Sequence, residues 1–126
     1  MKFSHSFSVA AEDIDAQNHV NNVAYVRWIQ EAAVAHWFSA TDETMREKFI
    51  WIVTRHEINY KKPAFENEEI TVETWVGEPT RVSWERFTEI RRGEDLLVEA
   101  RSVWCLIDRE TLKPTRITSE LKMIFQ

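Results

Sequence analysis

Residues 21–38 contain the clearest structural signal in the sequence. Apolar side chains recur there at three- and four-residue steps, the spacing that places side chains on one face of an α-helix. These residues are Val23, Val26, Ile29, Ala33 and Trp37, and the flanks add Tyr25, Trp28, Ala32 and Val34. Asn21 or Asn22 is suited to cap the helix. Because so much of its circumference is apolar, we expect the helix to be wrapped by other parts of the chain.

The remaining segments carry mainly strand patterns. Residues 3–9 alternate between an apolar side and a side made of serines, as a half-buried strand does. Further strand patterns cover residues 50–60, 69–76, 82–91 and 95–108. We expect Gly77 and Gly93 to be turn residues at strand ends. Short helices are predicted at about residues 42–48 and 118–125, the second with Thr118 as its cap.

This order of elements predicts an α+β fold with one strand, one long helix and then four or five antiparallel strands. A single twisted antiparallel sheet can curl around such a helix and bury it. The opposite face of the sheet would then be free to pair with another subunit. The length of 126 residues suits a single domain, residues 1–126.

Charge and composition exclude several classes of partner. Sixteen Lys and Arg residues against twenty-one Asp and Glu residues give a net charge of −5, which disfavours nucleic acid as a ligand. No stretch has the roughly 18 apolar residues that a membrane span requires, so no membrane association is expected. The single cysteine, Cys105, cannot form an intramolecular disulfide, and the simple interpretation is a cytoplasmic protein.

The segment 13–25, DIDAQNHVNNVAY, concentrates polar groups at the entrance of the predicted helix. Unpaired backbone N–H groups at a helix start can polarise a carbonyl group and stabilise an oxyanion. Asp15 precedes the helix by a few residues, so its carboxylate is placed to attack or to activate water, and His19 to share proton transfer. On spacing alone, these residues also suit an ordinary turn and cap, which is the interpretation we give Asp13.

The sequence resembles a known enzyme family over most of its length. Residues 13–32, DIDAQNHVNNVAYVRWIQEA, are similar to the 4-hydroxybenzoyl-CoA-thioesterase-like branch of the hotdog-fold acyl thioesterases. The same segment resembles plant acyl-ACP thioesterases, whose motif has this Asp…His-Val-Asn-Asn…Tyr spacing. Residues 55–76 and 102–117 continue the resemblance. It implies a hotdog fold, assembly into a homodimer or homotetramer, and hydrolysis of a CoA or acyl-carrier-protein thioester at a site between two subunits.

The resemblance also assigns roles to individual residues. The family's catalytic carboxylate falls on Asp15, the amide that polarises the thioester carbonyl falls at about Asn22, and His19 matches a histidine held to be catalytic in the plant motif. Asn18 and Tyr25 are expected to contact substrate. The plant motif has Asn two residues after the Asp, where this chain has Gln17, and many bacterial members have Gly at the position of Asn18.

A second group of candidates is basic. Arg55, Lys61 and Lys62 lie close in sequence near a predicted strand end, and Arg and Lys side chains pair well with phosphate. They are therefore candidates to bind the phosphates of CoA. A solvated charged edge is the equally plausible alternative.

Other chemistries find little support in the sequence. Glu31 lies more than two turns inside the predicted helix, and Cys105 lies in an apolar strand pattern typical of an inert buried thiol. The four histidines have no metal-ligand spacing, so neither a metal nor a cofactor is expected. A hotdog dehydratase would carry Pro-Gly after its histidine, whereas Val-Asn-Asn follows His19. A non-catalytic module that binds acyl-CoA or acyl-ACP on the same fold is the main alternative to a thioesterase.

Overall fold

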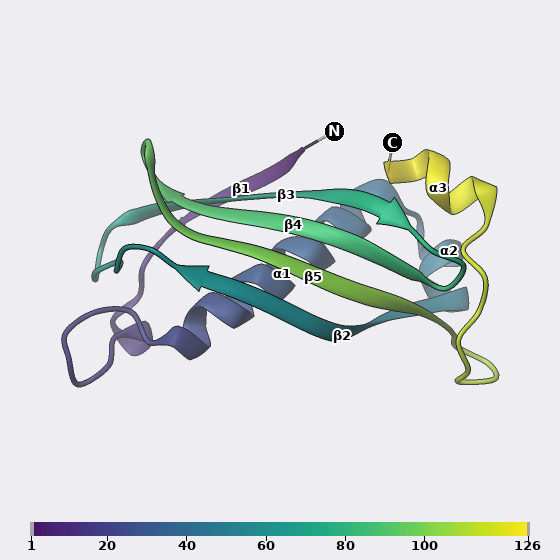
Figure 1. Cartoon of the computed structure of the whole chain (residues 1–126), viewed down its shortest axis with the longest axis horizontal. Helices are drawn as coiled ribbons and strands as arrows, with labels where there is room; N and C mark the ends of the chain where they lie inside the picture. The colour runs from purple at the N-terminus through teal and green to yellow at the C-terminus, as the bar shows by residue number, and fades with distance from the viewer. Residues whose placement is uncertain (1, 126) are drawn as a thin grey trace.

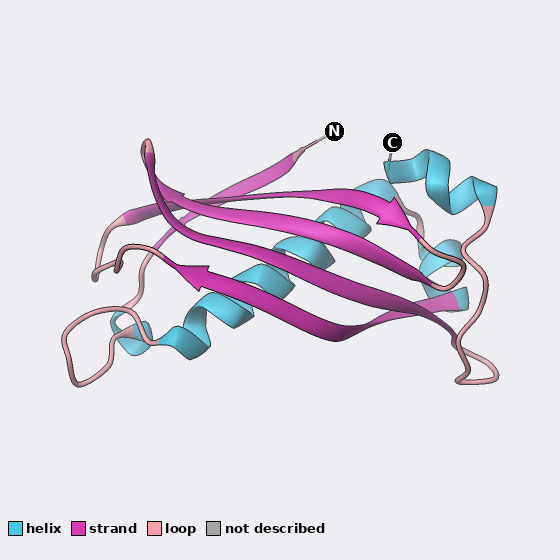
Figure 2. Ribbon diagram, in the orientation of Figure 1, coloured by secondary structure: helices cyan, strands magenta, loops and turns pink. Residues whose placement is uncertain are grey.

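The computed structural model describes residues 2–125 as a five-stranded antiparallel sheet with a long helix across one face (Figures 1 and 2). The strand order is β1-β3-β4-β5-β2. The elements in chain order are β1 (Phe3–Ser8), a 3-10 turn (Ala11–Asp13), α1 (Asn22–Ala40), α2 (Glu43–Lys48), β2 (Phe49–Tyr60), β3 (Glu69–Pro79), β4 (Ser83–Arg92), β5 (Asp95–Asp108) and α3 (Ser119–Phe125). This is the hotdog arrangement that the sequence predicts.

Helix α1 is stabilised at its start by a cap and along its length by burial. The Asn21 side chain accepts a hydrogen bond from the Val23 amide at 2.9 Å, which satisfies one of the donors that every helix start leaves open. The buried residues of α1 recur at three- and four-residue steps, as the helical period requires. They are Ala24, Tyr25, Trp28, Ile29, Ala32, Ala33, His36 and Trp37.

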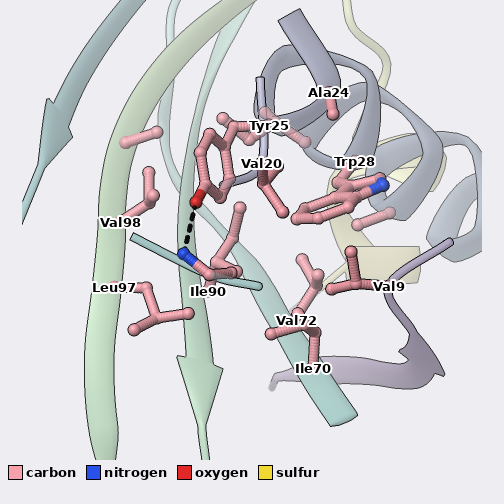
Figure 3. Packing of buried hydrophobic residues seen from close by; sticks show 14 residues of the cluster. Val9, Val20, Ala24, Tyr25, Trp28, Ile70, Val72, Ile90, Leu97 and Val98 are labelled. Carbon is pink, nitrogen blue, oxygen red and sulfur yellow. Dashed lines mark hydrogen bonds between the residues drawn. The ribbon is translucent and has the colours of Figure 1, made fainter. Parts of the chain in front are cut away.

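Two hydrophobic clusters lie between α1 and the sheet. The first surrounds the N-terminal half of α1, where Tyr25, Trp28 and Ile29 pack against β3, β4 and β5 (Figure 3). The second surrounds the C-terminal half, where Trp37 packs with Trp84 of β4 and Phe125 of α3. The helix is therefore held along its whole length by the sheet and by the C-terminal helix.

The sheet curls around one side of α1, as predicted, and leaves the other side exposed in the single chain. Val23 is 73% exposed, and Val34 and Phe38 are exposed as well, on the side away from the sheet. The reason is geometric, since one five-stranded sheet curls past only one face of a helix. No helix within residues 2–125 is long and apolar enough to cross a membrane.

The two glycines differ in role. Gly93 has φ 59° in the tight β4–β5 turn, as predicted. Gly77 lies inside β3 rather than in a turn, which corrects the sequence-based prediction, and β3 continues to Pro79. A Cβ at position 77 would collide with the Glu85 carboxylate and come within 2.8 Å of Phe87 Cε2. Gly77 is therefore explained by the close approach of β4 and its side chains.

Candidate active site

A tight loop brings Asp15 and His19 together ahead of α1. The Asp15 amide donates to the His19 carbonyl at 2.9 Å, and the Asn18 amide donates to the Asp15 carbonyl at 3.0 Å. Asn18 adopts a left-handed conformation with φ 71°, which Asn and Gly tolerate better than other residues. The structure thus gives Asn18 a turn-forming role, and this explains why glycine is a suitable residue at the same position.

The side chains of Asp15 and His19 are neighbours in this loop. Their closest atoms, Asp15 Oδ1 and His19 Nδ1, are 3.7 Å apart, and the side chains are 25% and 35% exposed. The Gln17 amide donates to Asp15 Oδ1 at 2.9 Å, which fixes the orientation of the carboxylate. A carboxylate held in this way beside an imidazole, and open to solvent, has the parts needed for proton transfer.

The start of α1 offers an unpaired amide beside this pair. The Val23 amide donates to the Asn21 side chain, and the Ala24 amide donates to the Asn21 carbonyl at 2.9 Å. Within residues 2–125, the Asn22 amide donates no hydrogen bond. Asn22 is the first residue of the helix, where the helix dipole favours negative charge. Its N–H group is therefore available to a ligand oxygen.

A cavity opens next to this amide. Its walls come from two parts of the chain, the loop and first turn of α1 on one side and the end of β2 on the other. The lining residues are His19, Val20, Asn22, Tyr25, Tyr60, Lys61, Lys62 and Pro63. Five of the residues singled out from the sequence thus surround one cavity. The Asp15 side chain is not among the lining groups and reaches the cavity only through its contact with His19.

Tyr25 is a structural anchor as well as a wall of the cavity. Its hydroxyl oxygen accepts a hydrogen bond from the buried Ala64 amide at 3.0 Å, drawn as the dashed line in Figure 3. Burial raises the pKa of Tyr25, so the hydroxyl stays protonated at neutral pH. The Ala64 carbonyl accepts the Val20 amide at 2.9 Å. The segment after β2 is thereby tied both to α1 and to the loop before it.

Tyr60, which the sequence reasoning missed, forms another wall of the cavity. Its ring centroid lies 5.7 Å from that of Tyr25. The available signal was an aromatic residue at the end of a predicted strand, directly before the basic pair Lys61 and Lys62. The basic pair was noted, but not the ring beside it.

The structure separates Arg55 from the two lysines, so the three basic residues do not form one group within a single chain. Lys61 and Lys62 follow β2 and line the cavity, where they pair with Glu99 at 3.5 Å and Asp95 at 3.2 Å. Arg55 is 65% exposed in the middle of β2 and pairs with Glu57 at 2.9 Å. His56, the next residue, contacts Gln30 of α1, so Arg55 points to the opposite face of the sheet.

The remaining candidates have structural partners. The buried carboxylate of Asp13 accepts a hydrogen bond from Arg27 at 2.7 Å, which fastens the loop to α1. Glu31 pairs with the same arginine at 3.2 Å on the exposed side of the helix. Cys105 is buried and forms no disulfide, and its thiol donates to the Leu106 carbonyl at 3.8 Å. Within residues 2–125, no three His, Cys, Asp or Glu side chains are grouped to hold a metal ion.

Comparison with solved structures shows that other proteins share this fold. The chain superimposes on the crystal structure of a 1,4-dihydroxy-2-naphthoyl-CoA thioesterase from Synechocystis with a TM-score of 0.85, at 16% identity, covering 99% of this chain and 96% of the other. It also matches a hypothetical protein from Staphylococcus aureus, solved in complex with CoA. That match has a TM-score of 0.88 at 14% identity and covers 98% and 81% of the two chains.

Sequence comparison identifies more closely related proteins. A chloroplastic palmitoyl-acyl carrier protein thioesterase from Gossypium hirsutum is 25% identical over 131 residues, covering 95% of this chain. The chain spans 32% of the length of that relative. The model of the acyl-ACP thioesterase N-terminal domain family matches residues 1–125. The chain therefore belongs to the acyl-ACP thioesterase N-terminal domain family, and it has the hotdog fold.

Proposed function

We propose that the chain hydrolyses an acyl thioester at the cavity beside the start of α1. The observation that carries this proposal is that the Asp15–His19 pair and the unpaired Asn22 amide lie together at one helix start. Family membership supports the reaction class. The residue roles are inferred from the geometry of the loop.

In the proposed mechanism, the Asn22 amide donates a hydrogen bond to the thioester carbonyl oxygen. Asp15 either accepts a proton from a water molecule that attacks the carbonyl carbon, or attacks that carbon itself. In the second route thiol release leaves an anhydride between the acyl group and Asp15, and water then hydrolyses this anhydride to the free acid and regenerates the carboxylate. The tetrahedral intermediate carries its negative charge on the oxygen held by Asn22, and the C–S bond then breaks to release the thiol. His19, 3.7 Å from Asp15, is placed to pass the proton to the departing sulfur. One such amide donor is worth roughly 3 kcal/mol of transition-state stabilisation.

The proposed substrate is an acyl-CoA or acyl-ACP thioester. The relative from Gossypium hirsutum is named for a carrier-protein substrate, whereas the Staphylococcus aureus protein was solved with CoA. Lys61 and Lys62 put positive charge at the cavity and suit a phosphate-bearing thiol arm of either kind. The proposal therefore includes both CoA and acyl carrier protein as the group that carries the acyl chain.

We further propose that the active protein is a homodimer or homotetramer. Val23, Val34 and Phe38 expose apolar surface on the side of α1 that the sheet does not cover. A second subunit would cover part of this surface or the far face of the sheet. Light scattering after size exclusion tests the proposal, and a monomer at micromolar concentration would contradict it.

Hydrolysis of a panel of acyl-CoA and acyl-ACP substrates, followed by release of free thiol, tests the reaction class. We expect activity that Asp15→Asn lowers by roughly 10²-fold or more, since the carboxylate is lost while the size of the side chain is kept. Asp42→Asn, which changes a carboxylate at the start of α2, is the matched control. Equal rates for wild type and Asp15→Asn would remove Asp15 from the mechanism.

The alternative is a module that binds the acyl thioester without turnover. It is favoured by one observation, that the Asp15 carboxylate does not itself line the cavity. Calorimetry that shows tight acyl-CoA binding, together with no thiol release from any member of the panel, would support this alternative.

A further inference from the structure

A second cavity lies far from the loop, under the C-terminal half of α1. We call it the tryptophan cavity because four indole rings, Trp37, Trp51, Trp84 and Trp104, line it. Its volume is about 70 Å³, several times the space that one water molecule occupies. Phe125 of α3 closes one side, with its ring centroid 5.5 Å from that of Trp84. The cavity is therefore mainly apolar and large enough for a small organic group.

Arg86 of β4 also lines this cavity and is only 6% exposed. Its Nη1 donates to His36 Nδ1 at 3.1 Å and to Thr74 Oγ1 at 3.0 Å, and both acceptors are uncharged groups when His36 is neutral. Within residues 2–125, neither Nε nor Nη2 has a hydrogen-bond acceptor. A buried guanidinium is normally paired with an anion, because an uncompensated buried charge is costly.

The acidic residue that lines the cavity does not neutralise this charge. Glu85 contributes to the cavity lining, but its carboxylate pairs with Arg101 Nε at 2.5 Å. Glu85 and Arg86 are consecutive in β4, so their side chains point to opposite faces of the sheet. His36 cannot supply an anion in any protonation state. The positive charge of Arg86 therefore lacks a counter-ion in the described part of the chain.

A second residue that lines the cavity also has a donor without a partner. The indole Nε1 of Trp104 is buried and makes no hydrogen bond. Trp104 pairs with Trp84 across β5 and β4, while Ser102 pairs with Arg86 two residues earlier on the same face. The wall of the cavity thus contains two residues with donor atoms that make no hydrogen bond in the described part of the chain, and one of the two residues is charged. Buried polar groups are usually hydrogen-bonded, so an acceptor placed between these two residues would satisfy both of them.

We propose that the tryptophan cavity binds a small organic carboxylate, with Arg86 and Trp104 holding its oxygens and the indole rings enclosing its apolar part. A carboxylate accepts the planar pair of donors that the free edge of a guanidinium presents. The group has two possible sources, a free carboxylic acid or the far end of an acyl chain that carries a second carboxylate. Trp37 lies roughly 22 Å along α1 from Asn22, so only a long chain joins the two cavities within one subunit.

Calorimetric titration with hexanoate, and with 1-hexanol as the neutral control, tests the site. We expect hexanoate to bind at least 10-fold more tightly than hexanol. Arg86→Met should abolish this preference, whereas Arg86→Lys should keep part of it and Arg116→Met, an exposed arginine, should leave it unchanged. Trp104→Phe should weaken hexanoate several-fold and leave hexanol binding intact.

Three results would overturn the proposal. One is that neither probe binds, which means that the cavity holds water only. Another is that hexanol binds as tightly as hexanoate. The third is that hexanoate affinity survives in both Arg86→Met and Trp104→Phe.

A comparison of hydrolysis rates distinguishes the two sources of the carboxylate, a free acid and the far end of an acyl chain. Faster hydrolysis of hexadecanedioyl-CoA than of palmitoyl-CoA, lost in Arg86→Met, assigns the cavity to the end of the acyl chain. Hexanoate binding without such a preference assigns it to a free acid. The hexanoate titration is also made on Asp15→Asn. Loss of hydrolysis with hexanoate binding kept would then concern only the proposed thioesterase function, and loss of hexanoate binding would concern only the tryptophan cavity.

Discussion

The two ends of α1 contain polar groups in opposite settings. At its start, Asp15 and His19 are partly exposed and held by loop amides, and the Asn22 amide is open to solvent. Under its C-terminal half, Arg86 and His36 are almost fully buried among aromatic rings. Polar side chains at the exposed end can change with little effect on folding. At the buried end each polar group is part of the packing, so substitution of a polar side chain there lowers the free energy of unfolding.

The largest effect on stability is expected at the aromatic cluster. Trp84→Ala removes a side chain that contacts Phe125 and Trp51 and donates from Nε1 to the Gly77 carbonyl at 2.9 Å. We expect a loss of about 3–5 kcal/mol in the free energy of unfolding, from denaturant titration. Phe65→Ala, an exposed aromatic residue, is the control and should cost much less. Similar losses for the two variants would contradict the described packing.

A pH effect of similar size is expected from His36. Burial, and then the charge of Arg86, lower the pKa of His36 to about 4. The unfolded chain therefore takes up this proton more readily than the folded chain. The resulting stability is fully present above about pH 6.5 and is lost as the pH falls toward 4. The difference is on the order of 3 kcal/mol.

Unfolding measured between pH 6.5 and 4.5 checks this prediction. His36→Gln keeps an acceptor for Arg86 but cannot titrate, so its stability should fall less than that of wild type over this range. His19→Gln, at the exposed end of the helix, is the matched control and should follow wild type. If His36→Gln lost stability as steeply as wild type, His36 would not be the titrating group.

A smaller effect is expected at Tyr25, on the boundary between the two settings. Tyr25→Phe leaves the buried Ala64 amide without its acceptor, so we expect a loss of about 1–3 kcal/mol. Tyr60→Phe, which removes an exposed hydroxyl from the same cavity, should change stability by less than about 0.5 kcal/mol. Equal thermal unfolding of the two variants would show that the Tyr25 hydrogen bond does not contribute.

The smallest effect is expected at the helix cap. Asn21→Ala removes the side chain that accepts the Val23 amide, and we expect a loss of about 1 kcal/mol. Asn21→Ser keeps a capping oxygen and should recover most of this loss. A cap effect below the error of denaturant titration would mean that α1 is held by its packing alone.

Much of the fold could be predicted from the sequence, because helix and strand periods are local. The positions of α1 and the strands, the cap at Asn21 and the Thr118 cap of α3 follow from such patterns. The exposed side of α1 could not be predicted from these patterns. Apolar residues such as Val23 also occur on surfaces that the single chain leaves uncovered, and the sequence does not distinguish them from buried ones.

Long-range partners could not be predicted in this way. A β-bulge between Val53 and Arg55 changes which residues of β2 face the helix, and the alternation of residue types does not reveal it. Arg55 lies after this bulge and six residues before Lys61 along an extended strand, which separates the two residues by roughly 20 Å, so closeness in sequence did not mean closeness in space. The pairing of Arg86 with His36 joins residues 50 positions apart, and only the register of the sheet against α1 brings them together.

The Asn22 amide is the point on which the proposed chemistry depends most directly. Asn22→Pro removes this N–H at the first helical position, where proline is well tolerated, and Asn21 already has the extended backbone that precedes proline. We measure kcat for thioester hydrolysis in Asn22→Pro and in Asn22→Ala, which keeps the amide, with unfolding followed in parallel. The account predicts a loss of roughly 10²- to 10³-fold in kcat for Asn22→Pro alone, at nearly unchanged stability. Wild-type kcat in a folded Asn22→Pro protein would contradict it.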